Sequence, residues 1–139
     1  MLALSIDNVK IFMVKLLKSP VFDEFTAKNV VVDTFARFEI NASDEAANWE
    51  NVRSYVFDII KNGGLPRSVK VVICADGEKY AMPDVGTLFI NIHFEGGKIN
   101  LTTGLSKKNF SLDKTDERQW DEIVIKFLEN AEIKYTNLV

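Results

Sequence analysis

Apolar residues recur with the period of an amphipathic helix in three stretches of the chain. Residues 9–17 place them at i, i+3, i+4, i+7 and i+8, and Pro20 ends this helix because it cannot extend the hydrogen-bond ladder. Residues 49–61 repeat the spacing and are followed by a Gly-Gly pair, a common helix end. Residues 115–131 carry the third apolar stripe. The pattern predicts three helices, each with one buried face.

Polar residues beside these stretches indicate where each helix begins. We expect Asp7 to cap the first helix and Thr115 to cap the third, since short polar side chains accept bonds from the free N–H groups of a first turn. Either Ser43 or Asn48 caps the second helix.

Alternation of apolar and polar residues predicts strands elsewhere. Residues 29–40 show this alternation, with Val31 and Phe35 among the polar residues of the second face, which predicts one strand with a single buried face. Residues 69–75 form a shorter β-branched run, and residues 109–113 and 133–135 are candidates for further short strands. The buried face expected for the first of these strands comprises Val30, Val32, Ala36, Phe38 and Ile40.

The clearest local signal is a β-hairpin. Residues 87–95 and 98–105 alternate on either side of Gly96-Gly97, and a two-residue turn of this kind needs a positive φ at both positions. Such a turn fixes the pairing register, which gives the hairpin one mostly apolar face and one polar face. The polar face, which we predict to contact a ligand or a partner, carries Phe89, Asn91, His93, Asn100 and Thr102.

These elements predict an α+β fold. Tight turns between neighbouring strands favour a mostly antiparallel sheet of about four to five strands, with the three amphipathic helices mainly on one face. Residues 1–139 show no linker or repeat, so we expect a single domain.

The amino-acid composition argues against some classes of binding partner. The chain has 17 Lys and Arg against 20 Asp and Glu, for a net charge of −3, and 47% of its residues are hydrophobic. An acidic globular domain lacks the basic surplus that holds DNA, so no DNA partner is expected. Neither a signal leader nor an apolar run of about 18 residues is present, which predicts no membrane contact. The single cysteine suits a reducing compartment, and we expect a cytoplasmic protein.

Two side chains are candidates for catalysis. His93 is the only histidine and could act as a general base on the polar hairpin face, although a position near a hairpin tip is also typical of a solvated residue. Cys74 would need His93 as its base to act as a nucleophile, and a free cysteine is more often a small buried residue. Strand order, which the sequence does not give, decides whether the two share a face.

Other binding chemistry has weaker support. One acidic group could hold a hard cation, but acidic residues in the first turn of a helix also suit the helix dipole. With one His and one Cys, and with no phosphate-binding or dinucleotide-binding motif, we expect no cofactor and no metal site. Phe22 and Phe25 are expected to pack in the core rather than form an exposed patch. The acidic group comprises Asp113, Asp116, Glu117 and Asp121.

Short motifs spread over most of the chain. They are Met1-Leu2-Ala3-Leu4, Phe12-Met13-x-Lys15-Leu16-Leu17, Val21-Phe22-Asp23, Leu65-Pro66-Arg67-Ser68-Val69-Lys70, Thr102-Thr103-Gly104, Phe110-Ser111-Leu112-Asp113-Lys114, Trp120-Asp121-Glu122 and Phe127-Leu128. In these motifs the chain resembles a family of short uncharacterised proteins from anaerobic Gram-positive bacteria, classed as a domain of unknown function. The resemblance implies a longer loop than residues 76–86 provide. It implies no activity, so no catalytic role passes to any residue.

The leading hypothesis is a non-enzymatic cytoplasmic module that binds another protein or a second copy of itself. An unpaired edge strand could also recruit another chain. One alternative is a small enzyme that uses His93 on the polar face of the 87–105 hairpin. Another is a weak single-stranded RNA binder whose sheet face offers Phe89 and Phe35 for stacking.

Overall fold

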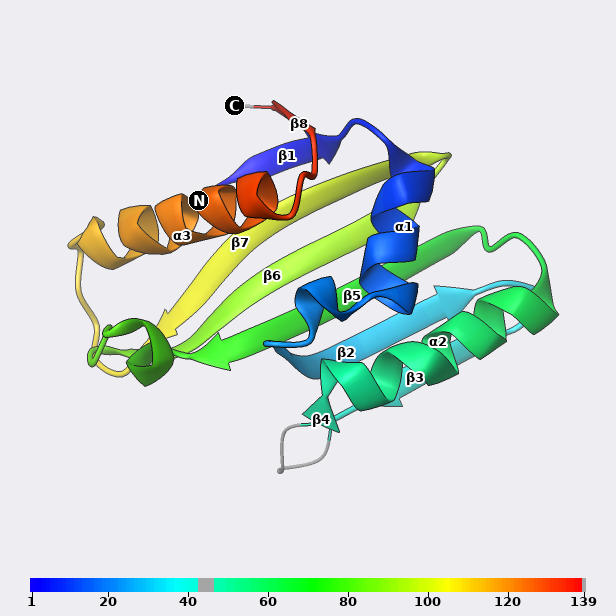
Figure 1. Cartoon of the computed structure of the whole chain (residues 1–139). Helices are drawn as coiled ribbons and strands as arrows, with labels where there is room; N and C mark the ends of the chain where they lie inside the picture. The colour runs from blue at the N-terminus through cyan, green and yellow to red at the C-terminus, as the bar shows by residue number, and fades with distance from the viewer. Residues whose placement is uncertain (43–46, 139) are drawn as a thin grey trace.

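The fold is built on one long antiparallel sheet (Figure 1). A computed structural model describes residues 1–42 and 47–138. The strands follow the order β3-β2-β5-β6-β7-β1-β8, and β4 pairs with β2 beside this path. The strands are β1 (Ala3–Ile6), β2 (Thr26–Asp33), β3 (Arg37–Asn41), β4 (Ala47–Asn48), β5 (Ser68–Asp76), β6 (Val85–Glu95), β7 (Lys98–Lys107) and β8 (Tyr135–Asn137).

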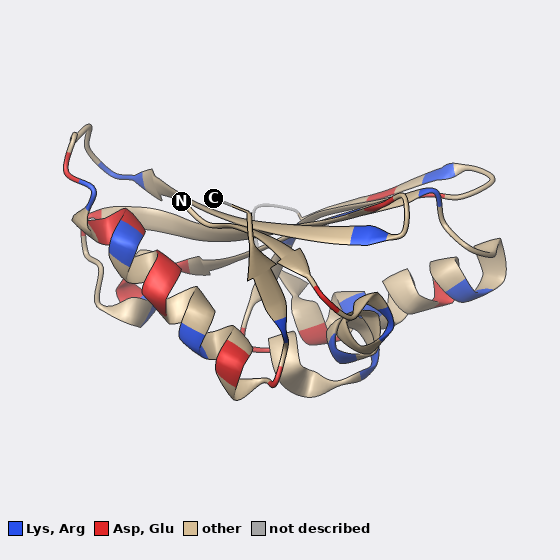
Figure 2. Ribbon diagram, turned by 90° about the horizontal axis from the view of Figure 1, so that it is seen from above, with Lys and Arg blue, Asp and Glu red and all other residues tan. Residues whose placement is uncertain are grey.

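All three helices lie on one side of the sheet (Figure 2), which confirms the predicted arrangement. They are α1 (Val9–Lys18), α2 (Trp49–Gly63) and α3 (Thr115–Asn130). The helix α3 packs against β7, whereas α2 packs against β2 and α1 lies beside α2. Two short 3-10 turns, η1 (Pro20–Phe22) and η2 (Gly77–Tyr80), complete the described elements. None of the helices in the described residues is long and apolar enough to cross a membrane.

The described residues form a sheet of eight strands rather than the expected four to five. Two of the additional strands, β1 and β4, have only four and two residues, too few to show an alternating pattern. They exist because a neighbouring strand supplies hydrogen bonds, as where β1 fills the gap between β7 and β8. The candidate strand at 109–113 is absent, since that segment is irregular.

The run of residues 29–40 is a hairpin rather than one strand. It turns at residues 34–36, where Thr34 N–H donates to the carbonyl of Ala36 at 2.9 Å. Four of the residues predicted to share a buried face still share one. Val30 pairs with Ile40 and Val32 with Phe38, and directly opposed residues lie on the same face of a sheet. Ala36 is in the turn and contributes nothing to that face.

The hairpin of β6 and β7 has the predicted register. Phe94 lies opposite Ile99 and Ile92 opposite Leu101 on the side that faces the helices, and β6 also pairs along its length with β5. The candidate edge strand near residue 135 is confirmed as β8, although Ile133 itself is buried in the core.

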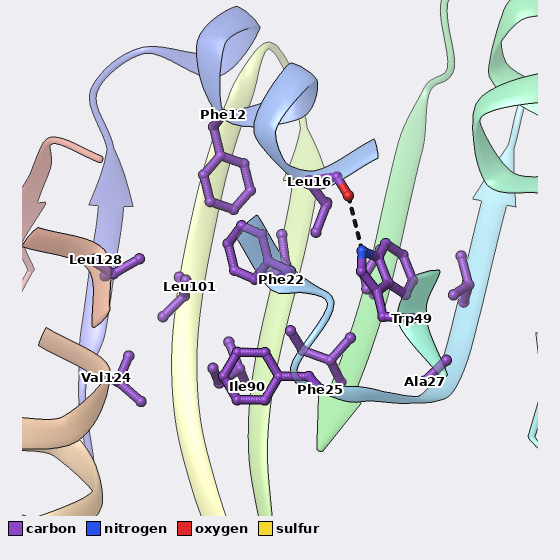
Figure 3. Close-up of a cluster of buried hydrophobic side chains, with 14 of the residues drawn as sticks. Phe12, Leu16, Phe22, Phe25, Ala27, Trp49, Ile90, Leu101, Val124 and Leu128 are labelled. Carbon is purple, nitrogen blue, oxygen red and sulfur yellow. Dashed lines mark hydrogen bonds between the residues drawn. The ribbon is translucent and has the colours of Figure 1, made fainter. Parts of the chain in front are cut away.

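The core fills the space between the sheet and the helices (Figure 3). Phe22 and Phe25 are buried in it, as predicted, with 0% and 3% exposure. The ring of Phe22 meets those of Phe12 and Phe127 edge-on, with centroids 5.6 and 5.2 Å apart. These contacts connect α1, η1 and α3 across the middle of the sheet.

Two of the predicted helix caps are wrong by one or two residues. Asn8, not Asp7, caps α1 by accepting from the N–H of Ile11 at 3.0 Å. Thr115 is the first residue of α3, and the carboxylate of Asp113 accepts from its N–H and its hydroxyl at 2.9 and 2.7 Å. Asn48 precedes α2 without a side-chain cap bond, and the alternative, Ser43, lies outside the described residues.

Candidate functional site

The five residues predicted to form a binding face lie together on the side of the sheet that faces away from the helices, the helix-free face. Asn91 is opposite Thr102, and His93 is opposite Asn100. Phe89 lies two positions along β6 and is opposite Gly104. Asn100 is exposed and the other four are half-buried by their neighbours. The register of the β6–β7 hairpin is sufficient to place these five side chains next to one another.

The strand order extends this face into an uncharged band across five strands. One row of opposed residues crosses β2, β5, β6, β7 and β1, and a second row lies beside it on the first four of these strands. The uncharged band comprises Asn29, Val72, Asn91, Thr102 and Ala3 in the first row, and Thr26, Cys74, Phe89 and Gly104 in the second. No residue in either row carries a charge, and Lys28 lies at the bulge of β2 between them, so the face is neutral along these two rows of the central strands.

Charged residues border the uncharged band on the side of the hairpin turn. Lys70 and His93 are opposed in the next row. Beyond them, Glu95 is opposite Lys98, and Asp33 accepts from the hydroxyl of Ser68 at 3.1 Å. Both signs of charge are therefore present along this margin.

His93 lies next to a carboxylate, and solvent does not reach its Nε2 atom. Its Nε2 is 3.2 Å from Oε2 of Glu95, an ion pair when the imidazole is protonated. The side chain is 36% exposed, yet Nε2 is shielded from solvent and makes no hydrogen bond with good geometry. A general base needs a nitrogen within hydrogen-bond reach of a substrate proton, and this nitrogen faces Glu95 instead.

Cys74 and His93 share the helix-free face but do not form a catalytic pair. Cys74 is opposite Phe89, four positions along β6 from His93, which corresponds to about 13 Å at the rise of a strand. The Cys74 Sγ lies 3.1 Å from the Thr26 hydroxyl instead. Cys74, considered as a candidate nucleophile, therefore has no histidine base in contact with it.

A cleft of 340 Å³ adjoins this thiol at the end of the uncharged band. Its lining includes Thr26, Cys74 and Phe89 of the uncharged band together with the charged Lys28 and Asp76. The cleft mixes apolar and polar surface with charges of both signs, so the uncharged band stops where β2, β5 and β6 end.

The turn η2 supports the wall of this cleft. Tyr80 donates its hydroxyl to Oε2 of Glu24 at 2.9 Å, and Lys79 Nζ donates to the Glu24 carbonyl at 2.5 Å. Burial raises the pKa of Tyr80 above its ordinary value, and the hydrogen bond to Glu24 raises it further. Tyr80 therefore stays a neutral donor that holds η2 against the residues before β2.

A second concave surface, which the sequence analysis missed, lies in the helix layer. A groove of 470 Å³ runs between α1 and α2 and is lined almost entirely by apolar side chains. Val14 of α1, which lines it, is 47% exposed. The signal in the sequence was the apolar Val14, which lies outside the stripe that predicts the buried face of this helix.

The acidic group near α3 is dispersed. Asp113 binds the first turn of α3 and Asp121 accepts from the Thr103 hydroxyl at 2.6 Å, whereas Glu117 lies 3.4 Å from Lys114. Asp116 lies in the first turn of the helix, where a negative charge is favourable. Within the described parts of the chain, no three His, Cys, Asp or Glu side chains are placed to hold a metal ion.

The aromatic pair considered for RNA stacking is split. Phe89 belongs to the uncharged band, but Phe35 is in the turn between β2 and β3, where it is 77% exposed and contacts Phe38 edge-on. Stacking of successive bases needs neighbouring aromatic platforms on one surface. The fold does not supply that arrangement with these two residues.

The comparison with protein families places the chain in a family. The profile of a family of unknown function, DUF5721, matches residues 41–136, which is more than half of the chain. The chain belongs to this family, in agreement with the resemblance seen in its motifs. The matched region contains β5, β6 and β7 and so most of the uncharged band. Searches of curated proteins and of solved structures gave no significant match.

Proposed function

We propose that the protein is a non-enzymatic interaction module that docks through its helix-free face, and that the partner at this face is a second copy of the chain. The uncharged band, with Phe89 in it, is the observation that carries the proposal. The cores of protein interfaces are depleted of charged residues and enriched in aromatic ones.

The margins of the band favour a symmetric partner. In a two-fold contact the same surface meets itself, so a surface of one sign would repel its copy. Here Lys70 and Lys98 lie near Asp33, Glu39 and Glu95, which allows opposite charges to meet in at least one rotation. Complementary rims of this kind fix the orientation of two copies more than they add affinity.

The area of the face is sufficient. Seven strands spaced by about 4.8 Å give a width of about 29 Å, and the central strands of nine to eleven residues are about 30 Å long. Because the outer strands are shorter, the usable face is on the order of 800 Å². That is the area which each partner of a standard interface buries.

Sedimentation velocity over the micromolar range tests the proposal. We expect a species of twice the 15.7 kDa chain mass that dissociates on dilution. Thr102→Arg puts a charge at the centre of the uncharged band and should weaken the dimer at least about tenfold. Tyr55→Arg is the matched control, since Tyr55 is 67% exposed on α2 and far from the helix-free face.

Two results would overturn the proposal. A chain that stays at the monomer mass over the whole range has no second copy at this face. A dimer that persists in Thr102→Arg, with the far-UV circular dichroism unchanged, uses another surface. Native mass spectrometry of the same samples reports any bound small molecule, which would favour a ligand over a second copy.

A further inference from the structure

The groove between α1 and α2 is a second and separate binding surface. Its volume is 470 Å³, within the range of sites that hold drug-sized molecules. Val9, Met13, Val14 and Leu17 form the wall from α1, and Phe57 and Ile60 form the wall from α2. The groove lies in the helix layer, so the uncharged band on the other side of the sheet does not contribute to it.

The helix α1 has more apolar surface than the core uses. Its ten residues are seven apolar residues and three lysines. Phe12, Leu16 and Leu17 are buried, but Ile11 and Val14 remain 51% and 47% exposed. A helix that only covers a sheet keeps polar residues on its outer side, whereas a helix that is apolar nearly all round is normally covered on that side as well.

The charges at the groove have one sign. Lys10 and Lys18 are the charged residues that line it, and α1 contains no acidic residue. Lys18 Nζ is 4.5 Å from the centre of the Phe57 ring, so this cation lies across one end of the groove. The two lysines are eight residues apart on α1, which places them about 12 Å from each other along the helix. On a chain of net charge −3, this is a locally basic and apolar surface.

We propose that this groove binds an acidic amphipathic helix of another protein. Apolar anchors at i, i+3 or i+4, and i+7 of such a helix span about 10.5 Å, close to the separation of Lys10 and Lys18 along α1. Carboxylates outside the anchors then pair with a lysine at each end. The charge of the groove disfavours a symmetric contact with a second copy of the chain, because such a contact would bring these lysines together. A long-chain carboxylate would pair with one lysine and leave the other unmatched.

Fluorescence anisotropy with two labelled synthetic peptides tests this proposal. Both peptides carry leucine at the anchor positions of a helix of about four turns. One has glutamate at all other positions and the second has lysine there. We expect the acidic peptide to bind with a dissociation constant in the micromolar range and the basic peptide to bind at least about tenfold more weakly.

The chain offers a matched pair of variants on one helix. Val14 lines the groove and Ile11 does not, yet both are about half exposed on α1. Val14→Glu should weaken the acidic peptide at least about tenfold, because it adds an unpaired like charge to the apolar wall. Ile11→Glu should leave the affinity unchanged. The double variant Lys10→Glu/Lys18→Glu should reverse the preference and bind the basic peptide more tightly.

Several outcomes would overturn the proposal. Absence of binding by the acidic peptide at millimolar concentration does so, as do equal affinities for the two peptides or an equal loss in Val14→Glu and Ile11→Glu. Displacement of the peptide by palmitate at micromolar concentration would assign the groove to an acyl chain instead. The variant Thr102→Arg should bind the acidic peptide normally, so this proposal and the dimer at the helix-free face fail or succeed independently.

Discussion

The indole of Trp49 donates a hydrogen bond from Nε1 to the main-chain carbonyl of Leu16 at 2.9 Å and so joins the start of α2 to the end of α1 (Figure 3). In a continuing helix, the N–H four residues later would satisfy this carbonyl. That residue is Pro20, which has no N–H. The side chain of Trp49 is fully buried, and it replaces the donor that the sequence removed. This bond helps to hold together the two helices that form the apolar groove.

We expect Trp49→Phe to destabilise the fold by about 1–3 kcal/mol, since it leaves a buried carbonyl without a donor and removes part of a packed ring. Urea denaturation measures the loss as a lower midpoint at an unchanged m-value. Tyr55→Phe on the same helix is the control, because Tyr55 is exposed. A loss in Trp49→Phe no larger than in the control would mean that the bond contributes nothing measurable.

Local signals predicted the parts of the fold that local interactions determine. The register of the β6–β7 hairpin could be predicted because a two-residue turn at Gly96-Gly97 fixes which residues are opposed. The place of β1 between β7 and β8 could not be predicted, because that pairing joins the two ends of the chain and depends on no nearby turn. The strand order, in turn, decides which side chains of different strands share a row.

Only the part of the candidate site that lies on the hairpin could be predicted from the sequence. Asn91 and Thr102 were placed opposite each other by the hairpin, but their extension to Val72 and Asn29 depends on the order of β2 and β5. The groove was missed for another reason. The period of α1 identifies its buried stripe, while the remaining exposure of Val14 depends on how α2 packs beside it.

Thr103 lies on the apolar side of the hairpin, where its hydroxyl takes part in a buried hydrogen-bond network. Thr103 is 1% exposed, its hydroxyl donates to Oδ1 of Asp121 at 2.6 Å, and it accepts from the N–H of Leu2 at 2.9 Å. This side chain connects β7 to α3 and to the residue before β1. Thr103→Val keeps the shape but removes both bonds, and we expect a loss of about 1–3 kcal/mol. Thr102→Val, one residue away on the helix-free face, should cost less than about 0.5 kcal/mol.

Thermal and urea unfolding at low protein concentration distinguish these two variants without a contribution from dimerisation. Equal stabilities of Thr103→Val and Thr102→Val would show that the Asp121 contact does not stabilise the fold.

Gly77 is required by the close approach of two main-chain carbonyls. A Cβ at this position would lie 2.3 Å from the carbonyl oxygen of Val85 and 2.6 Å from that of Met82. Gly77→Ala should therefore shift η2, which contains Tyr80 and brings Lys79 to the wall of the cleft, at a cost of about 1–3 kcal/mol. Gly86→Ala is the matched control, because its Cβ would make only ordinary contacts with Ser106, at 3.4 Å or more.

The measurement for this pair is urea denaturation together with the environment of Tyr80 in the NMR spectrum. We expect displaced Tyr80 resonances in Gly77→Ala and native ones in Gly86→Ala. Native stability and native Tyr80 resonances in Gly77→Ala would contradict the close approach.

The start of α3 should make stability depend on pH in acid. Hydrogen bonds from the hydroxyl and the N–H of Thr115 lower the pKa of Asp113 below its ordinary value. A carboxyl whose pKa is lower in the folded state stabilises that state above the pKa of the unfolded chain, and the contribution disappears as the pH falls through the folded value. Asp113→Ala should therefore lower the unfolding temperature by a few degrees at neutral pH, and the difference from the native chain should vanish in strong acid.

Asp113→Asn separates the charge from the cap in this experiment. Asparagine accepts the same two bonds from Thr115 but does not titrate, so this variant should keep most of the stability at neutral pH. Its unfolding temperature should also depend less on pH than that of the native chain. A difference between Asp113→Ala and the native chain that stays constant from neutral pH to strong acid would contradict the lowered pKa, because a protonated Asp113 would then cap α3 as well as an ionised one does.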